Sequence, residues 1–294
     1  LAGCNLNCAW CDTPASLSEG VEMSVDEVIA KIAESGLQYV CITGGEPLVK
    51  KNIVSICRRA AAVEGIREVC LTTNGLLLPK LAKELREAGV KRLNLSLDTL
   101  DPEKYAYITR IGQLEDFKAG LEAALEAGFE KVKINAVLIG GFNDDEIERL
   151  AGLTLEYPVD VRFIEMMPMY DSGDFDESAF IPYTRVLEKL PEAVPVEQDG
   201  GVAKLSRLPG AMGNIGLISP INAHFCGQGN RIRLTADGKL KPCLHQEEEY
   251  SLKGLDFAGM KKAGFKIVDQ PQYFYKKSEG FRHIEKQAKN DRLY

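Results

Sequence analysis

Three cysteines near the start of the chain constrain it more than any other feature: Cys4, Cys8 and Cys11 have the spacing C-x3-C-x2-C within GCNLNCAWCDTP. Three thiols within eight residues can turn toward one metal centre, and thiolates are the usual protein ligands of iron–sulfur clusters. A four-iron cluster held by three thiolates keeps its fourth iron open to another molecule. Cysteine is also often a small buried hydrophobe, but core packing has no need of this spacing. The motif therefore predicts an iron–sulfur site.

Composition excludes several other classes of protein. The chain has 294 residues, a net charge of −7 and an isoelectric point near 5.3, which argue against a general nucleic-acid binder. The sequence shows no apolar run long enough to span a bilayer and no secretory signal pattern. We therefore expect a cytoplasmic protein that does not enter a membrane.

The remaining cysteines divide into two groups. Eight cysteines in a chain of this length do not indicate a disulfide scaffold, and clustered spacing favours metal ligation. Cys226 and Cys243 are further candidate ligands. Cys41, Cys57 and Cys70 lie in apolar stretches, so we expect these three in the hydrophobic core.

Short apolar runs alternate with amphipathic stretches over the first two-thirds of the chain. Ser24 and Glu27 form a capping-box pattern that predicts the start of a helix, and Gly36 predicts its end. Compact apolar runs bounded by turn residues are typical of buried parallel strands. The predicted strands are residues 39–42, 69–72, 92–95, 132–138 and 161–164.

Polar motifs follow the ends of these strands. They are TGGEP (43–47), TTNG (72–75), SLD (96–98) and EMM (165–167). An open doubly wound sheet would gather its functional groups at one switch point. Polar groups after every strand are instead typical of a barrel, whose carboxyl rim carries the site. The fold class is therefore α/β, and the motifs favour a barrel.

The strict alternation of strands and helices stops near residue 175. We therefore predict two domains, residues 1–175 and 176–294. The second has a candidate helix at 183–190 and strand-like runs at 202–205, 215–219, 231–234 and 239–244. Asp237-Gly238 lies between the last two runs and predicts a hairpin turn.

The motifs together resemble a known family. CNLNCAWC is similar to the cluster loop of radical S-adenosylmethionine enzymes, and TGGEP to the turn that holds the amino group of that cofactor. More narrowly, ITGGEPLVKKNI, LTTNGLLL, LNLSLDTLDPEKY, KINAVLIGGFNDDEI, RFIEMMPM and FCGQGNRIRLTADGKLKPCL occur in the order found in the molybdenum-cofactor GTP 3′,8-cyclase family. This resemblance implies an incomplete (βα)6 barrel of TIM type, closed by a C-terminal α+β domain.

The resemblance also implies a chemistry. A [4Fe–4S] cluster at Cys4, Cys8 and Cys11 would bind S-adenosylmethionine and, given an electron from an external donor, cleave it to a 5′-deoxyadenosyl radical. That radical would take the C3′ hydrogen of GTP, and the sugar radical would attack C8 of guanine, in molybdopterin synthesis. The positions that match cofactor contacts are Gly44, Gly45, Glu46, Ser96 and Met167; those that match nucleotide contacts are Thr72, Lys133, Arg162, Arg231 and Arg233.

Two of these positions also suit the nucleotide on physical grounds. Arg231 and Arg233 alternate on one predicted strand and so point the same way. Their forked donors suit phosphate oxygens or a purine edge. A pair of arginines on a solvated strand face is the alternative interpretation.

The chain departs from the family pattern at a second cluster. The family holds that cluster with three cysteines spaced C-x2-C-x13-C, and this chain has Cys226 and Cys243 but Gly229 at the middle position. The second site is therefore lost, completed by His224 or His245, or occupied by a different metal.

Three further departures concern the substrate end and the chain termini. Tyr39 and Cys41 stand where the family usually has basic side chains that hold the triphosphate. WCDTP replaces the usual YCMP and resembles the 7-carboxy-7-deazaguanine synthase branch. The chain begins at Leu1 and stops at Tyr294, so we expect that a strand and a Gly-Gly tail lie beyond its ends.

Three functions remain open at this stage. The first is the GTP 3′,8-cyclase. The second is a divergent radical enzyme for another purine or a peptide, favoured by Gly229, Tyr39, Cys41 and the WCDT loop. The third is a non-catalytic iron–sulfur protein, which would have no need of TGGEP or Ser96. The expected partners are GTP or another small molecule and an electron donor, and a homodimer is left open.

Overall fold

The computed structural model describes residues 3–9, 11, 23–166, 177–197, 203–220, 232–241, 249–252 and 259. Its centre is an eight-stranded sheet with the order β1-β2-β3-β4-β5-β8-β7-β6. Strands β1 to β5 and β8 run parallel, and β7 and β6 join antiparallel at one edge. The strands are β1 (Tyr39–Ile42), β2 (Glu68–Thr73), β3 (Val90–Ser96), β4 (Lys131–Leu138), β5 (Val159–Glu165), β6 (Val194–Val196), β7 (Lys204–Arg207) and β8 (Ile215–Ile218).

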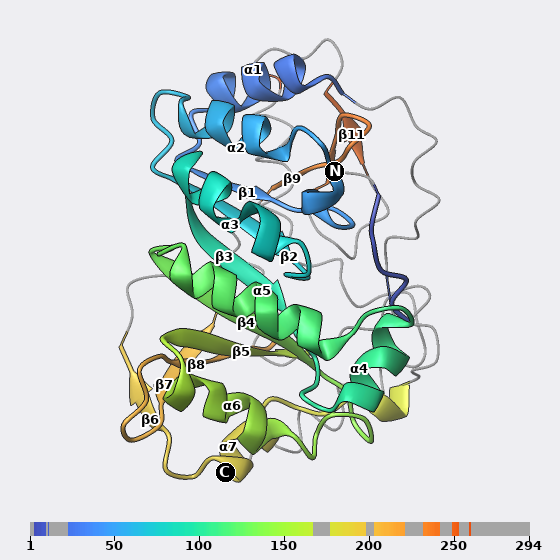
Figure 1. Cartoon of the computed structure of the whole chain (residues 1–294), viewed down its shortest axis with the longest axis vertical. Helices are drawn as coiled ribbons and strands as arrows, with labels where there is room; N and C mark the ends of the chain where they lie inside the picture. The colour runs from blue at the N-terminus through green and yellow to red at the C-terminus, as the bar shows by residue number, and fades with distance from the viewer. Residues whose placement is uncertain are drawn as a thin grey trace.

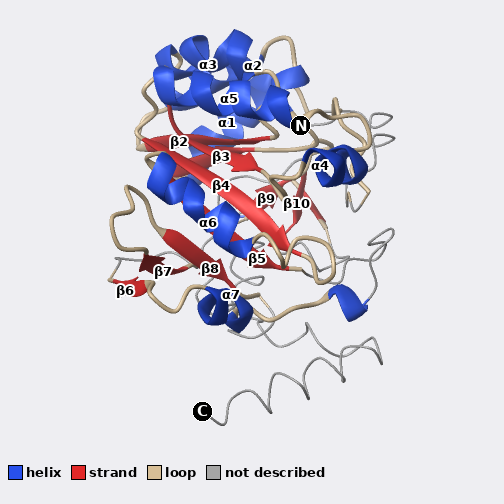
Figure 2. Cartoon of the chain, turned by 60° about the horizontal axis from the view of Figure 1, so that its bottom comes forward, coloured by secondary structure: helices blue, strands red, loops and turns tan. Residues whose placement is uncertain are grey.

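Helices connect the parallel strands and cover one face of the sheet (Figures 1 and 2). This repeated strand–helix order confirms the predicted α/β fold, a partial barrel of parallel strands. The helices are α1 (Val25–Ser35), α2 (Ile53–Ala61), α3 (Leu78–Glu87), α4 (Pro102–Thr109), α5 (Leu114–Glu126), α6 (Ile147–Glu156) and α7 (Thr184–Lys189), with short 3-10 turns η2 (Pro47–Val49) and η3 (Glu177–Ala179).

Helix α1 begins and ends where the sequence predicts. The Ser24 side chain accepts a hydrogen bond from the Glu27 amide, and the Glu27 carboxylate accepts one from the Ser24 amide at 2.9 Å. The helix stops at Gly36, whose φ of 64° is the left-handed conformation that favours glycine. Both ends of the helix are therefore set by local sequence.

The hydrophobic core lies between the helices and the sheet. Leu71, Leu93, Ile134 and Phe163 are fully buried there, each on a different parallel strand. Side chains alternate along a strand, so the positions between these residues face the opposite side. On that side the parallel strands carry polar side chains, which we call the polar face: Thr72, Asn94, Lys133, Asn135 and Arg162.

The predicted core contains one error. Cys57 and Cys70 are buried, with 0% and 3% of their surface exposed, as expected. Cys41 is exposed, so its placement in the core was wrong. It lies on the edge strand β1 and points to the side of the sheet that the helices do not cover, as its contact with Thr72 shows.

A second sheet comprises β9 (Arg233–Leu234), β10 (Lys239–Lys241) and β11 (Tyr250–Ser251) in the antiparallel order β11-β10-β9. Asp237-Gly238 forms the turn between β9 and β10, as predicted, and Gly238 has a φ of 83°. The Met23 amide donates a 2.9 Å hydrogen bond to the Ala236 carbonyl. The small sheet is thereby attached to the segment that leads into α1.

The main sheet continues across the boundary predicted near residue 175, because β8 pairs with β5. The division into residues 1–175 and 176–294 stays a prediction. None of the helices in the described part of the chain combines the length and apolar character needed to cross a membrane.

Candidate active site

The cysteine loop lies directly on the TGGEP turn. The Glu46 amide donates a 2.8 Å hydrogen bond to the Gly3 carbonyl. A Cβ atom placed on Gly45 would overlap that carbonyl and lie 3.1 Å from the Cβ of Cys4. Only glycine allows this approach, so the second glycine of the motif brings the first cysteine to the carboxyl edge of the sheet.

The other end of the loop is held by helix α4. The Ala9 amide donates to the Ile108 carbonyl at 2.8 Å, and the Asn7 amide donates to the Thr109 carbonyl at 3.4 Å. Leu6, next to Asn7, is buried, with 8% of its surface exposed. The loop is therefore fixed on both sides, and the cysteines extend from a defined backbone.

The three thiols influence one another electrostatically. Burial, together with the charges of the nearby groups Asp98, Cys11 and Cys4, raises the pKa of the Cys8 thiol to about 12. Burial also raises the pKa of Cys4, with a contribution from Cys11. The sulfurs therefore share one region, in which their negative charges need a cation.

These residues fit a four-iron cluster better than a single metal ion. Among the described residues, no three His, Cys, Asp or Glu side chains converge tightly enough to hold one ion. A cubic cluster instead takes each thiolate at a different corner, and all three candidate donors are thiols. The raised pKa values of Cys4 and Cys8 agree with such an occupant, because a cationic cluster would stabilise their thiolates.

Glu46 connects the motifs of the rim. Its carboxylate accepts hydrogen bonds from Thr73 Oγ1 at 2.7 Å, from the Asn74 amide at 2.7 Å and from the Leu48 amide at 2.9 Å. Glu46 is only 1% exposed, and burial raises the pKa of its carboxyl. Asn74 in turn donates to Asn5 Oδ1 at 2.8 Å. TGGEP, TTNG and the cysteine loop thus form one hydrogen-bonded unit, as the rim prediction requires.

The end of β3 completes this edge. Ser96 is exposed at the last position of the strand, and Asp98 accepts a 2.8 Å hydrogen bond from the Val137 amide. The charge of Asp98 reaches Cys8, whose pKa it raises. The SLD motif therefore lies near Cys8, whereas the TGGEP turn contacts the loop at Gly3 and Cys4.

Three of the predicted nucleotide contacts meet on the polar face. Asn94 stands between Thr72 and Lys133 in the strand register. The Asn94 side-chain nitrogen Nδ2 donates a hydrogen bond to Thr72 Oγ1 at 3.1 Å. The side-chain oxygen Oδ1 accepts a 2.6 Å hydrogen bond from Arg162 Nη2. A chain of hydrogen bonds therefore runs from β2 to β5 across the sheet.

The polar face carries several positively charged side chains. Arg92 pairs with Glu68 at 2.7 Å and Lys131 with Asp160 at 2.8 Å, so these charges cancel in pairs. Burial and the positive charges of Arg162 and Arg92 together lower the pKa of Lys133 to about 8. A site that disfavours its own lysine charge will favour an anionic ligand.

The polar face also contains buried polar atoms that make no hydrogen bond in the described part of the chain. Asn135 Oδ1 and Arg92 Nε are buried without a hydrogen-bond partner in the described structure. Such atoms are uncommon in protein cores and each lost bond is costly. A polar ligand on this face would supply the missing bonds.

Some predicted site residues lie outside the described residues. These are Met167, Arg231, Cys226 and Cys243, together with Gly229, His224 and His245. Arg233 is described and lies half-buried on β9. Tyr39 and Cys41 are both exposed on β1, where the resemblance expects basic side chains.

Sequence analysis missed Asn94, Asn135 and Arg92. A signal was present in β3, where Arg92, Asn94 and Ser96 occupy alternate positions of a strand that is otherwise apolar. Period-two alternation of this kind indicates one polar face. The runs were instead interpreted as strands buried on both faces.

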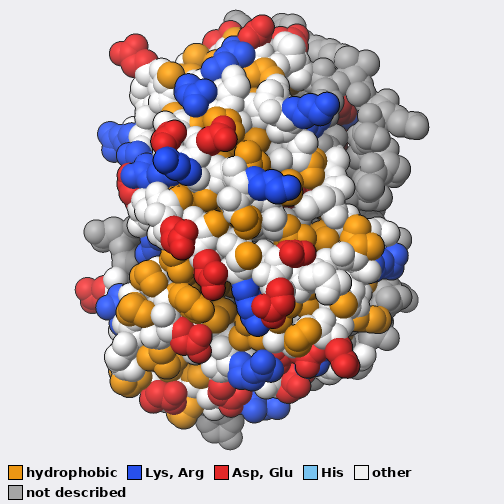
Figure 3. All heavy atoms as spheres, viewed as in Figure 1, with side chains coloured by type: hydrophobic (Ala, Val, Ile, Leu, Met, Phe, Trp, Pro, Cys, Tyr) orange, Lys and Arg blue, Asp and Glu red, His pale blue; other side chains and the backbone are white. Residues whose placement is uncertain are grey.

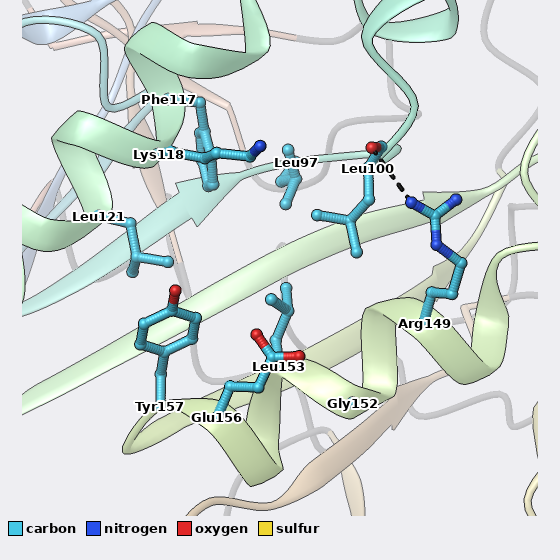
Figure 4. A pocket seen from close by; sticks show the side chains of 10 residues that line it. All are labelled: Leu97, Leu100, Phe117, Lys118, Leu121, Arg149, Gly152, Leu153, Glu156 and Tyr157. Carbon is cyan, nitrogen blue, oxygen red and sulfur yellow. Dashed lines mark hydrogen bonds between the residues drawn. The ribbon is translucent and has the colours of Figure 1, made fainter.

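A groove also opens on the helix-covered side, between α5 and α6 (Figure 4). Its volume is about 330 Å³, and Arg149 donates a 3.4 Å hydrogen bond to the Leu100 carbonyl at its border. Acidic, basic and apolar side chains are interspersed over this side of the molecule (Figure 3). The groove contains none of the predicted site residues. Its lining is Leu97, Leu100, Phe117, Lys118, Leu121, Arg149, Gly152, Leu153, Glu156 and Tyr157.

Comparisons with known proteins agree with this geometry. A family model described as Radical SAM superfamily matches residues 1–154, and one described as Molybdenum Cofactor Synthesis C matches residues 159–263. The GTP 3′,8-cyclase of Peptoclostridium acidaminophilum is 46% identical over 85% of this chain and 80% of its own length. The GTP 3′,8-cyclase of Alkaliphilus oremlandii is 44% identical with the same coverage.

Solved structures share the fold at low sequence identity. SuiB of Streptococcus suis has a TM-score of 0.66 at 15% identity, over 92% of this chain and 64% of its own. The protein anSMEcpe, solved with bound AdoMet, has a TM-score of 0.60 at 17% identity, over 91% and 80% of the two chains. These two structural matches cover 92% and 91% of this chain and agree with its fold.

Proposed function

The chain belongs to the GTP 3′,8-cyclase family of radical S-adenosylmethionine enzymes, and we propose that its polar face is where GTP binds. The reaction converts GTP to (8S)-3′,8-cyclo-7,8-dihydroguanosine 5′-triphosphate in molybdenum cofactor biosynthesis. One observation carries the proposal: the cysteine loop is hydrogen-bonded through Asn5 to Asn74, two residues beyond Thr72 on the positively charged polar face.

Cys4, Cys8 and Cys11 would hold the [4Fe–4S] cluster, and Gly44, Gly45, Glu46, Ser96 and Met167 would surround S-adenosylmethionine. When bound, this pair supplies a 5′-deoxyadenosyl radical that removes the C3′ hydrogen of the GTP ribose. Glu46 acts through position, because both of its oxygens accept bonds from rim residues. The chain thereby sets the distance between cofactor and substrate.

The residues of the polar face anchor the nucleotide. The triphosphate is anionic, and Lys133 and Arg162 offer charge-assisted donors to it. Asn94 holds Arg162 in place, and Thr72 adds a hydroxyl that can donate or accept. Arg231 and Arg233 would reach the nucleotide from the second domain. Several contacts to the nucleotide would keep the ribose in a fixed position after its C3′ hydrogen has been removed.

A second cluster is part of the family's chemistry, and Cys226 and Cys243 would supply two of its thiolates. Gly229 cannot supply the third. The remaining ligand is proposed to be His224 or His245, with loss of the cluster or a different metal as the competing outcomes. Iron content together with the content of other metals distinguishes these three cases.

The surroundings of the reaction follow from the same family. We assign an external one-electron donor and a cytoplasmic location to the enzyme, whose relatives are bacterial. Residues 1–175 would form the radical domain and residues 176–294 the closing domain.

The test is an anaerobic assay of the reconstituted protein with dithionite, S-adenosylmethionine and GTP deuterated at C3′. We expect 5′-deoxyadenosine that carries deuterium, together with the cyclised nucleotide. Unlabelled 5′-deoxyadenosine without GTP consumption would transfer support to a divergent enzyme that acts on another purine or a peptide. Absence of S-adenosylmethionine cleavage would support the non-catalytic iron–sulfur protein.

A further inference from the structure

Two cysteines occupy paired positions at the edge of the main sheet. Cys41 on β1 and Cys70 on β2 are direct register partners in the parallel ladder. Register partners on neighbouring strands, about 4.8 Å apart, present their side chains side by side on one face. Cys41 Sγ lies 3.6 Å from Thr72 Oγ1, so this is the face that carries the polar residues.

The two thiols differ in access. Cys41 is exposed, whereas Cys70 is 3% exposed, and neither is in a disulfide. The pKa of Cys70 is raised well above that of an ordinary thiol. The largest cause is its hydrogen bond with Cys41, and the second is burial. An external reagent therefore meets Cys41 first, with Cys70 directly behind it.

A cation stands beside the buried member of the pair. The Arg92 guanidinium interacts with the Cys70 sulfur and also pairs with Glu68 at 2.7 Å. A neighbouring guanidinium stabilises a thiolate, which offsets part of the cost of ionising a buried sulfur. The environment of Cys70 thus differs from that of Cys57, which has 0% exposure and no cation among its pKa-shifting neighbours.

We propose that Cys41 and Cys70 form a thiol–disulfide site that reacts with small-molecule disulfides such as oxidised glutathione. The Cα separation expected for register partners, about 4.8 Å, falls within the usual range for a disulfide of about 4.4–6.8 Å. Exposed thiols next to a resolving cysteine are typical of redox-responsive sites in cytoplasmic proteins.

The reaction balances in two exchange steps. The Cys41 thiolate attacks one sulfur of oxidised glutathione, and the glutathione S–S bond breaks to release one glutathione. Cys70 then attacks Cys41 Sγ, and the second glutathione leaves. The two protons of the protein thiols pass to the two glutathione molecules, so the pair loses two electrons and oxidised glutathione gains them.

Closure of this disulfide would alter the polar face. Cys41 Sγ would turn toward Cys70 and away from Thr72, which is a proposed nucleotide contact. This consequence depends on the proposed function, whereas the disulfide itself does not. An experiment can therefore refute the proposed function without refuting the disulfide, and the reverse.

The test uses the anaerobically reconstituted protein in buffers with a graded ratio of reduced to oxidised glutathione. Free thiols are then blocked, and the protein is digested with trypsin. Cleavage after Lys31, Lys50, Arg67 and Lys80 separates Cys41 in peptide 32–50 from Cys70 in peptide 68–80. Cys57 lies between them in the separate peptide 52–58 and is the internal control.

We expect the peptides 32–50 and 68–80 to become linked at oxidising ratios, and dithiothreitol to release them. In Cys70→Ser the reaction should stop at a glutathione adduct on Cys41, and in Cys41→Ser neither peptide should react. A wild-type protein that stays unlinked at every ratio overturns the proposal, as does one that keeps a stable glutathione adduct on Cys41. The wild-type protein alone can support or overturn the proposal, so the test remains valid even if a serine variant does not fold.

Discussion

Arg162 on β5 donates a 2.6 Å hydrogen bond to Asn94 on β3 and thus spans the intervening strand β4. Asn94 is also the register partner of Lys133 on β4, and the charge of Arg162 lowers the pKa of Lys133. Asn94 is therefore a positioning residue for Arg162. It keeps the guanidinium on the polar face, where a phosphate or a base would meet it.

Asn94→Ala should weaken nucleotide binding without loss of the cofactor cluster. A hydrogen bond to a charged group contributes about 1.5–3 kcal/mol, and its loss releases both Arg162 and Thr72. The dissociation constant of GTP, measured by anaerobic calorimetry, should rise by about tenfold or more, since 1.4 kcal/mol is one factor of ten. Cluster absorbance serves as the control and should match that of the wild type. Unchanged GTP affinity would remove Asn94 from the site.

Lys133 should make nucleotide binding depend on pH. In the free protein its pKa is lowered to about 8 by burial and by the charges of Arg162 and Arg92. An anionic triphosphate favours the charged amine, so the bound pKa is higher and binding takes up a proton above pH of about 8. GTP affinity should therefore fall as pH rises through this range. Lys133→Met should bind GTP more weakly and lose the proton uptake, which calorimetry in two buffers of different ionisation enthalpy measures.

Gly45→Ala should displace the cysteine loop. Its new Cβ would overlap the Gly3 carbonyl and press on Cys4. We expect a lower iron content and loss of S-adenosylmethionine cleavage in anaerobically reconstituted protein. The matched control is Gly152→Ala in α6, where the added methyl meets open space. That variant should keep its iron and gain about 0.5–1 kcal/mol of helix stability. Equal iron content in both variants would argue against the close approach.

Local sequence predicted the fold well where the signal was itself local. The capping box at Ser24, the stop at Gly36 and strand β1 occur at the predicted residues, because caps and short apolar runs depend on neighbours in the chain. The rim motifs were also predicted, since parallel strands end at a common edge. The position of Cys4 on Gly45 agrees with this.

The pairing of residues across the polar face could not be predicted in the same way. Asn94 meets Lys133, and Asn135 meets Arg162, only through the register of separate strands. No spacing in the sequence encodes that register. Cys41 and Cys70 show the same limit, because both lie in apolar runs and one is exposed solely because β1 is the edge strand.

Cys8→Ala should abolish the cofactor cluster while the protein stays folded. Cys8 is the middle thiol of the loop, and its charge is coupled to both Cys4 and Cys11. Two remaining thiolates rarely hold a four-iron cluster. The visible absorbance of the cluster and all S-adenosylmethionine cleavage should therefore be lost. Circular dichroism should be unchanged, because the backbone attachments of the loop at Gly3 and Ala9 do not involve that side chain. Full retention of cleavage would refute its role as a ligand.

Gly229→Cys tests the second cluster, for which the chain has only Cys226 and Cys243 of the three family cysteines. If the site is an impaired cluster, the new thiolate completes the ligand set, and iron and acid-labile sulfide per chain should increase on anaerobic reconstitution. The Cys8→Ala variant provides the background, because all iron that remains in it belongs to the second site. The double variant Cys8→Ala with Gly229→Cys should therefore bind more iron than Cys8→Ala alone. Equal iron in these two proteins would mean that the C-terminal region no longer holds a cluster of the family type, and the substrate would then have to be bound without it.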